Sequence, residues 1–301
     1  MNKIKSMIIE LRAPFLTVTI LPVLIGTALA HRAGVKIDIA AFWLIMSGFI
    51  FLHLGTNVLN DYFDWKNGTD NVNKKFISPF TGGSRLIQAN VLKPRVVLIE
   101  GLAMFIVATA LFIPLIHSRG IILFWVLLFS LVAGGFYTAP PFKWAHKGFG
   151  ELLIFASFGP LMVATSYYIL TGTVTSAVLA ASILPGLLAA SVVDINEFPD
   201  HDADKKTGKA NLIVRLGTRR GKYSYFIMIV LAYISVVAAV MVRLLPVTAL
   251  FALLALPFSI NASLVLARYH DKPAKLAPAC GMTIIAHLVG ALAIAVVLYI
   301  K

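Results

Sequence analysis

The sequence predicts an all-α, polytopic membrane protein with nine transmembrane helices. Of its 301 residues, 59% are hydrophobic and only 13% are charged, whereas a soluble domain carries about 25% charged residues. Apolar runs close to 20 residues long, the length that crosses a bilayer as a helix, recur along the whole chain. The single cysteine, Cys280, lies within one of these runs, which argues against a disulfide framework and against a metal–thiolate site.

The apolar runs follow one another with polar, glycine-containing or proline-containing turns between most of them. They cover residues 14–30, 39–60, 95–116, 120–138, 150–170, 176–196, 223–242, 246–267 and 278–300. We therefore expect one membrane-embedded domain over residues 1–301. Asn60 and Asn196 head two acidic clusters that are four runs apart, which indicates a four-helix pseudo-repeat followed by a ninth helix.

The first run also has features of a cleaved signal peptide. Lys3, Lys5 and Arg12 precede it, and it ends in Ala28-Leu29-Ala30, which matches the Ala-x-Ala pattern of a cleavage site. Against cleavage, Arg12 and Pro14 adjoin the apolar run, and the run is nearly long enough to cross the membrane. We predict that it is retained as the first helix.

Positive charge is concentrated on one side of the predicted membrane topology. With nine spans, 21 of the 26 Lys and Arg residues fall at the N-terminus or after the second, fourth, sixth and eighth runs. The positive-inside rule then places the N-terminus in the cytoplasm and the C-terminus outside. The formal net charge of +13 thus reflects orientation in a cell (cytoplasmic) membrane, and we expect contact with the lipid bilayer and no nucleic-acid partner.

A row of amide and carboxylate groups ends the second run. Four of its members are three or four residues apart, so they share one face of a helix: Asn57, Asn60, Asp61 and Asp64. Gly68 stands where the next member of the repeat falls, and Asp70 follows two residues later. Such a face of oxygen ligands, where a membrane helix meets water, is costly to bury and indicates a binding site.

A second polar row ends the sixth run, on the same predicted side of the membrane. Asn196, Asp200 and Asp204 are spaced at intervals of four and again share one helical face. Each row alone is also explained by solvated loop acids and helix caps. Two rows with matching spacing instead favour an oxygen-only site for Mg²⁺, whose coordination shell a bound diphosphate completes, with the site open to the cytoplasm.

Lys and Arg side chains surround both rows, and most are explained by the positive-inside rule or by contact with lipid headgroups. One or two could bind a diphosphate directly, as cations do at phosphoryl groups. Lys143 is the first candidate, because the turn at Pro140 and Pro141 would hold it near the membrane surface.

The two rows resemble the paired motifs of the UbiA superfamily of intramembrane prenyltransferases. The segment 60–64 (Asn-Asp-Tyr-Phe-Asp) with Gly68 and Asp70 is similar to the first motif, and the second row is similar to its partner. Shorter matches extend over most of the chain, at residues 11–14, 137–141, 148–151 and 208–217. The first motif and the Gly-x-Gly-Glu segment at 148–151 are most similar to the menaquinone branch, 1,4-dihydroxy-2-naphthoate polyprenyltransferase.

The resemblance implies a helical bundle around a central cavity, and it implies roles for individual residues. It assigns Mg²⁺-diphosphate binding to Asn60, Asp64, Asn196, Asp200 and Asp204, with Asp61 and Asp70 as supporting ligands. Asp64 and Asp200 would be the catalytic pair. Tyr137 and Lys143 match family positions near the diphosphate, and Arg12 matches one at the first helix. Because Gly68 occupies the third acidic position of the commoner pattern, Asp70 is expected to serve in its place.

The reaction implied by the resemblance is Mg²⁺-dependent transfer of a polyprenyl group from a prenyl diphosphate to an aromatic acceptor. The branch points to 1,4-dihydroxy-2-naphthoate, in menaquinone biosynthesis. The alternatives are transfer to 4-hydroxybenzoate or to another quinone or lipid precursor, and a terpene cyclase or lyase that uses the same allylic cation without an acceptor. A third, from a different class, is an ion-coupled transporter whose intramembrane acids bind ions.

Overall fold

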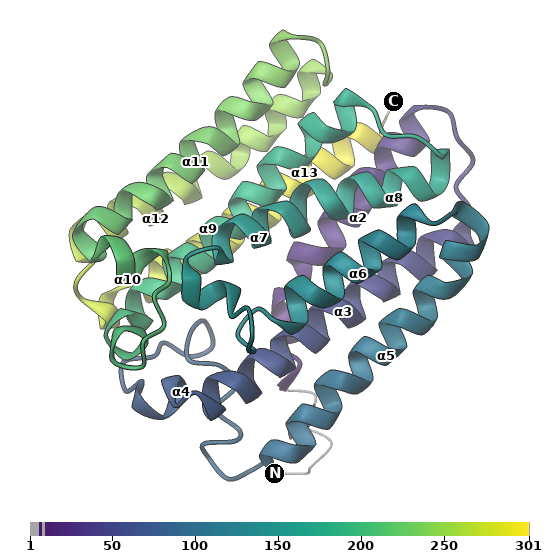
Figure 1. The fold of residues 1–301 in the computed structure, drawn as a ribbon. Helices are drawn as coiled ribbons and strands as arrows, with labels where there is room; N and C mark the ends of the chain where they lie inside the picture. The colour runs from purple at the N-terminus through teal and green to yellow at the C-terminus, as the bar shows by residue number, and fades with distance from the viewer. Residues whose placement is uncertain (1–5, 8–9, 301) are drawn as a thin grey trace.

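The fold is a bundle of long helices that pack side by side (Figure 1). The structure is a computed structural model, and it describes residues 6–7 and 10–300. Lys3, Lys5 and Lys301, which contribute to the predicted charge asymmetry, lie outside the described residues. The regular structure of the described residues is helical throughout.

The longer helices account for every apolar run of the sequence. They are α2 (Thr17–Arg32), α3 (Ile39–Lys66), α5 (Pro94–Arg119), α6 (Ile122–Gly135), α7 (Gly150–Ala156), α8 (Met162–Thr171), α9 (Ser176–Lys206), α11 (Thr218–Met241), α12 (Leu256–Tyr269) and α13 (Ala277–Tyr299). Two short helices, α4 (Thr69–Val72) and α10 (Leu212–Leu216), lie at one end of the bundle (Figure 1).

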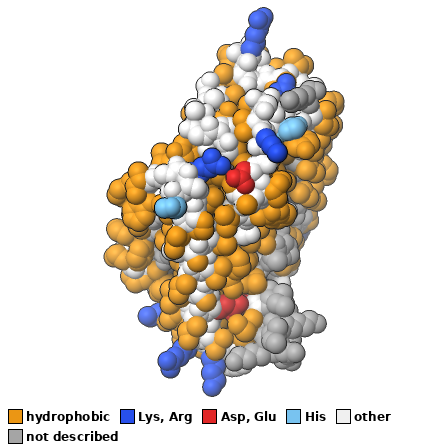
Figure 2. All heavy atoms as spheres, turned by 90° about the vertical axis from the view of Figure 1, so that its right-hand side faces the viewer, with side chains coloured by type: hydrophobic (Ala, Val, Ile, Leu, Met, Phe, Trp, Pro, Cys, Tyr) orange, Lys and Arg blue, Asp and Glu red, His pale blue; other side chains and the backbone are white. Residues whose placement is uncertain are grey.

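Seven helical segments within the described part of the chain are long and apolar enough to cross a membrane, and α2 and α6 are shorter apolar helices. Hydrophobic side chains cover the middle of the face in Figure 2, and most of the Lys and Arg side chains on it lie toward the two ends. Residues such as Ile106 and Met241 turn outward, 69% and 77% exposed, as expected for side chains that meet lipid. The chain is therefore described as a multi-pass membrane protein, while the count of nine spans and the cytoplasmic N-terminus stay predictions.

The buried apolar side chains form two main clusters. One joins α2, α8, α9, α11, α12 and α13, and the other joins α3, α5, α6 and α8. Within these clusters α3 packs along α5 and α9 packs along α11. Because α2 contributes Leu21 and Ile25 to the first cluster, the segment that resembled a signal peptide is an integral part of the packed core.

Several predicted helix ends are wrong, and two of these errors concern the polar rows. The second run was predicted to end near residue 60, but α3 continues to Lys66; the sixth was predicted to end near 196, but α9 continues to Lys206. Polar residues lower the apolar signal without ending the helix, so both rows lie within continuous helices. In contrast, α6 ends at Gly135, before the predicted residue 138, and residues Val247–Ala255 of the eighth run form 3₁₀ helix.

The fifth run is one helical segment with a π-helical turn, Ser157–Leu161, between α7 and α8. Pro160 has no backbone N–H to donate, which disfavours a regular α-helical turn there. Gly159 in this turn meets Gly186 of α9 so closely that a Cβ on Gly159 would lie 2.6 Å from the Ser182 carbonyl oxygen. The absence of side chains at these two positions therefore allows the turn to approach α9.

The orientation in the membrane can be tested with single cysteines. Replacing the buried Cys280 by alanine gives a cysteine-free background, and Lys205→Cys and Val174→Cys then mark exposed positions near opposite ends of α9. We expect a membrane-impermeant maleimide to label the Val174 variant in intact cells and the Lys205 variant only after permeabilisation. The reverse pattern would place the acidic clusters outside the cell.

Candidate active site

A cavity opens between α3 and α9, at the helix ends that are predicted to face the cytoplasm. It encloses about 1190 Å³ of empty space, counted out to its open mouth. Eight of the ten predicted site residues line it: Arg12, Asn60, Asp64, Asp70, Tyr137, Asn196, Asp200 and Asp204. The fold thus brings together residues that are up to 192 positions apart in the sequence.

Two polar helix faces form opposite walls of the cavity. Asn60 and Asp64 form the polar face of α3, and Asn196, Asp200 and Asp204 form that of α9. Because each helix is continuous through its polar residues, the spacing of four keeps each set on one face. The geometry agrees with the predicted pair of facing rows.

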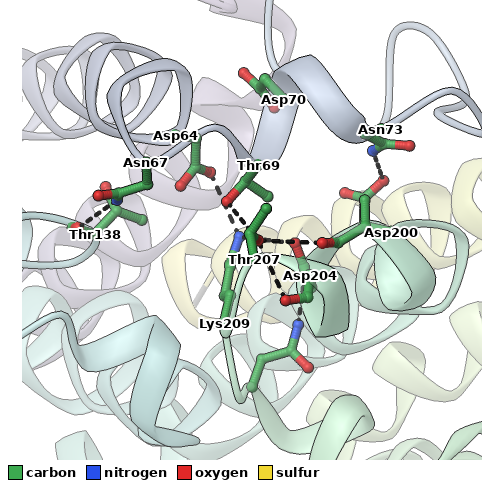
Figure 3. Close-up of polar contacts among 12 residues, drawn as sticks. Asp64, Asn67, Thr69, Asp70, Asn73, Thr138, Asp200, Asp204, Thr207 and Lys209 are labelled. Atoms are coloured by element: carbon green, nitrogen blue, oxygen red, sulfur yellow. Dashed lines mark hydrogen bonds and ion pairs between the residues drawn. The ribbon is translucent and has the colours of Figure 1, made fainter.

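Lys209 lies between the two polar faces (Figure 3). Its Nζ is 3.4 Å from Asp64 Oδ2 and 3.7 Å from Asp204 Oδ1, and its side chain is 14% exposed. Burial alone would lower the pKa of Lys209, but Asp204, Asp64 and Asp200 outweigh it and raise that pKa well above its usual value. Lys209 therefore stays a cation that links α3 to α9 electrostatically.

Amide side chains fix the carboxylates of the α9 polar face. Asn73 Nδ2 donates to Asp200 Oδ1 at 2.7 Å, and Asn211 Nδ2 donates to Asp204 Oδ2 at 2.7 Å. Asn211 is also the N-cap of α10, where its Oδ1 accepts from the Val214 N–H. The two bonds join the segments after α3 and after α9 to the same wall of the site.

Asp61 and Asp70 lie beneath a loop that follows α4. Asp61 Oδ2 accepts from the Ser84 backbone N–H at 2.7 Å, and Asp70 Oδ2 accepts from Gln88 Nε2 at 3.1 Å. Gly83 passes between them with φ +70°, and a Cβ there would lie 2.7 Å from Asp61 Oδ1. Asp61, which is outside the cavity lining, thus holds the loop in place.

The two carboxyl groups beneath this loop differ in their surroundings: Asp61 has a nearby cation, whereas Asp70 is dominated by burial and by other acids. Burial, followed by the charges of Asp64 and Asp61, raises the pKa of Asp70 to about 8. Arg12 provides a counter-charge for Asp61, with NH1 4.0 Å from Asp61 Oδ1, and it also donates to the Phe80 carbonyl at 3.3 Å. Arg12 thus connects the start of the chain to both α3 and the loop, while its side chain lines the cavity.

Gly68 stands where an acidic residue was expected, and Lys143 was the first candidate for a lysine that binds diphosphate. Gly68 has φ +83° at the start of α4, a left-handed conformation that disfavours an acidic residue there. Asp70 follows in the first turn of α4 and reaches the cavity. Lys143 lies outside the cavity lining, and its Nζ donates to Asn67 Oδ1 at 3.2 Å. Lys209, rather than Lys143, is the lysine that reaches between the polar faces.

The residues present fit an Mg²⁺ ion that protein oxygens and phosphate oxygens coordinate together, rather than one coordinated by protein ligands alone. On the two polar faces, four buried side-chain oxygens have no hydrogen-bond partner among the described residues: Asn60 Oδ1, Asp64 Oδ1, Asn196 Oδ1 and Asp204 Oδ1. No three His, Cys, Asp or Glu side chains among the described residues form a metal-binding group by themselves. Mg²⁺ commonly takes only one or two carboxylates and completes its shell with water and phosphate oxygens, which matches unpartnered oxygens on facing walls.

Below the polar faces the cavity continues into an apolar space of about 480 Å³, and His53, Thr56, Tyr137, Ile154 and Phe158 line both. Leu161 lines both this space and a groove of about 840 Å³ between α6 and α8. The polar mouth is therefore followed by apolar lining, with a further apolar space and an apolar groove beside it. This shape suits an amphiphile with a charged head and a long hydrocarbon tail.

A family model described as the UbiA prenyltransferase family matches residues 19–287. The chain belongs to this family. Membership confirms the family expected from the paired motifs, and with it the expectation of a transferase-class enzyme.

Two curated UbiA relatives are named for naphthoate or naphthoquinone substrates. The chain is 33% identical over 140 residues to the 1,4-dihydroxy-2-naphthoate octaprenyltransferase of Bacillus subtilis, a match that covers 46% of this chain and 42% of that enzyme. It is 23% identical over 273 residues to the 2-carboxy-1,4-naphthoquinone phytyltransferase of Synechocystis, covering 89% and 85% of the two chains. These names support the resemblance to the menaquinone branch.

Solved UbiA structures share the fold. A UbiA homolog from Archaeoglobus fulgidus bound to DMAPP and Mg²⁺ matches with a TM-score of 0.60 and 16% identity, over 97% of this chain and 99% of that one. The apo structure of a UbiA homolog from Aeropyrum pernix matches with a TM-score of 0.63 and 15% identity, over 92% and 97%. At these identities the likeness concerns the helical fold alone.

Sequence reasoning missed three residues that organise the site. Lys209 was noted only as one of several cations, and Asn73 and Asn211 were not singled out. Their partners come from α9 or from both polar faces, so no local spacing in the sequence marks them. The one available signal was the position of Lys209, five residues after the last acid of the second row.

The charge balance predicts a metal-dependent stability effect. Lys209→Gln leaves Asp64 and Asp204 without their cation, so we expect it to destabilise the purified protein in EDTA by about 3 kcal/mol. Added Mg²⁺ should recover part of the loss, because it can neutralise the same carboxylates. The readout is thermal unfolding of the purified protein with and without Mg²⁺.

Lys75→Gln is the matched control, because Lys75 pairs with Asp202 at 2.7 Å on an exposed surface. This change should cost at most about 1 kcal/mol, with no dependence on Mg²⁺. If the Lys209 variant and the wild-type protein unfolded at the same temperature in EDTA, Lys209 would not be the cation that compensates the buried acids.

Proposed function

We propose that this UbiA-family protein transfers a prenyl group from a prenyl diphosphate to an aromatic acceptor, with Mg²⁺ as cofactor. The observation that carries the proposal is a cavity whose lining combines two facing polar helix faces with apolar side chains such as Ile154 and Phe158. The polar mouth fits the diphosphate, and the apolar interior fits the isoprenoid chain. The membrane setting suits both, since a long hydrocarbon tail belongs in lipid while the charged head belongs at an interface.

At the mouth, this chain's residues bind and orient the diphosphate. Asn60 and Asp64 on one wall, and Asn196, Asp200 and Asp204 on the other, would hold Mg²⁺ together with diphosphate oxygens. When bound, Mg²⁺ neutralises negative charge that develops on the leaving diphosphate. Lys209 and Arg12 add fixed positive charge on the cavity lining, which stabilises the same developing charge. Asp61 and Asp70 contribute by holding the loop over the site.

Tyr137 is placed to donate a hydrogen bond at the polar end. It lines both the main cavity and the apolar space below. Burial, followed by the charges of Glu151 and Glu197, raises the pKa of Tyr137, so its hydroxyl stays protonated and remains a donor. Lys143 is proposed as an outer contact, since its ammonium is held on Asn67 at the end of α3.

The apolar interior protects the reacting carbon from water. As the C–O bond to the diphosphate breaks, its electron pair stays on the diphosphate, and an electron-rich carbon of the acceptor ring supplies the pair for the new C–C bond. The ring then loses a proton. With 1,4-dihydroxy-2-naphthoate the carboxylate also leaves as CO₂, and a proton replaces it. A hydrocarbon-lined site favours this route over hydrolysis of the allylic cation.

The first acceptor to test is 1,4-dihydroxy-2-naphthoate, because the two curated relatives carry naphthoate and naphthoquinone names. The assay incubates purified protein with Mg²⁺, a radiolabelled prenyl diphosphate and a panel that includes dihydroxynaphthoate and 4-hydroxybenzoate. Prenylated dihydroxynaphthoate is the expected product. Product with another phenol would reassign the acceptor, products from prenyl diphosphate alone would indicate a cyclase or lyase, and no diphosphate release at all would overturn prenyl transfer.

Substitutions at the two polar faces should abolish turnover. We expect Asp64→Asn and Asp200→Asn each to lower kcat by at least about 100-fold, as losing a group that stabilises transition-state charge does. Asp202→Asn is the matched control on α9, because that carboxylate is exposed and pairs with Lys75 outside the cavity. It should stay within about twofold of the wild type. Full turnover by both cavity variants would contradict the site assignment.

A further inference from the structure

His53 is a buried polar group in the apolar part of the cavity. It lies on α3 seven residues before Asn60, which places it about 10 Å deeper along the helix axis. Its residue is 7% exposed, and it lines both the main cavity and the apolar space below. A histidine at this depth faces the region where the hydrocarbon chain and the acceptor must meet.

The imidazole ring is held from one side only. Nδ1 lies 2.7 Å from Thr19 Oγ1 on α2, and Thr19 is itself fully buried. The Phe158 ring packs edge-on against the imidazole, with centroids 5.0 Å apart. Within the described structure Nε2 has no hydrogen bond, so one nitrogen is anchored and the other is free to meet a ligand.

The chemistry of the two substrates indicates which one would use this nitrogen. A prenyl chain is hydrocarbon and offers nothing to an imidazole, and the diphosphate is held about two helical turns away at the polar faces. His53 Nε2 is not among the fully buried unpartnered atoms, and His53 lines the cavity, so a ligand in the cavity can reach this nitrogen. A hydroxylated aromatic ring, in contrast, carries both a donor and an acceptor of hydrogen bonds.

We propose that His53 binds a ring hydroxyl of the aromatic acceptor through Nε2, with Thr19 as the residue that positions it. This inference rests on the proposed prenyl transfer. The Thr19 hydroxyl can donate to Nδ1 or accept from it, so Nε2 can correspondingly donate to the substrate oxygen or accept its proton in a hydrogen bond. His53 and Phe158 together would therefore hold the acceptor ring beside the reacting carbon of the donor.

His287 is a second buried histidine, and it differs from His53 in its relation to the cavities. It is fully buried in α13, and neither of its ring nitrogens has a hydrogen-bond partner in the described part of the chain. It lines none of the three cavities described above. His287 is therefore a matched control: it is also a buried histidine, and it lies outside the lining of these cavities.

The test uses steady-state kinetics of the full-length enzyme with Mg²⁺, geranyl diphosphate and 1,4-dihydroxy-2-naphthoate. We expect His53→Leu to raise the acceptor KM about tenfold or more and to leave the donor KM unchanged. His53→Gln, whose amide nitrogen reaches a place close to that of Nε2, should restore most of the affinity. Thr19→Val should give an intermediate rise in acceptor KM, and His287→Leu should leave both KM values unchanged.

Acceptors that lack one hydroxyl make the test specific. With 1-hydroxy-2-naphthoate or 4-hydroxy-2-naphthoate, one compound should bind His53→Leu and wild-type enzyme equally, because the group that His53 recognises is missing. A changed donor KM with an unchanged acceptor KM would overturn the proposal and make His53 part of the wall around the prenyl chain. Should the leucine variant fail to fold, an acceptor KM for Thr19→Val that stays within twofold of wild type and equals that of His287→Leu would also overturn the proposal.

Different results would overturn prenyl transfer and the role of His53. Wild-type enzyme that releases no diphosphate with any acceptor would overturn prenyl transfer itself. Wild-type enzyme that prenylates dihydroxynaphthoate, while the His53 and Thr19 variants retain its acceptor KM, would overturn only the role of His53.

Discussion

The structure depends on burying several carboxylates where two membrane helices reach the polar end of the bundle. Such burial is costly unless each charge meets a counter-charge or a donor. Lys209 meets this need between α3 and α9, while Asn73 and Asn211 each fix one carboxylate of α9. Four side-chain oxygens of the two polar faces still lack a hydrogen-bond partner among the described residues. The same arrangement that strains the folded protein therefore prepares it to bind a cation with an anionic ligand.

The two polar faces could be predicted from the sequence because their physics is local. A spacing of three or four places Asn60 with Asp64, and Asn196 with Asp200, on single helical faces whatever the surrounding fold. Helix ends were harder, because the polar residues that create the site also hide the continuation of α3 and α9 from an apolar pattern. That the two faces line one cavity follows from the packing of the bundle, which the spacing alone does not give.

Non-local contacts could not be predicted in this way. Lys143 was favoured on the basis of a turn, yet its ammonium lies on Asn67, and Lys209 comes from a segment that folds back after α9. Asp61 belongs to the same polar row as Asp64, but it turns under the loop at Gly83 and Ser84. The direction of each side chain depends on which distant segment packs beside it, and a single sequence does not contain that information in readable form.

The π-helical turn at Ser157–Leu161 has a consequence for how related chains are compared. It inserts one residue into a helix, and one residue corresponds to about 100° of rotation. A relative with an uninterrupted helix therefore requires a one-residue gap at this point of an alignment. Without that gap, every position from 162 to 171 would be paired with a side chain that points in a different direction.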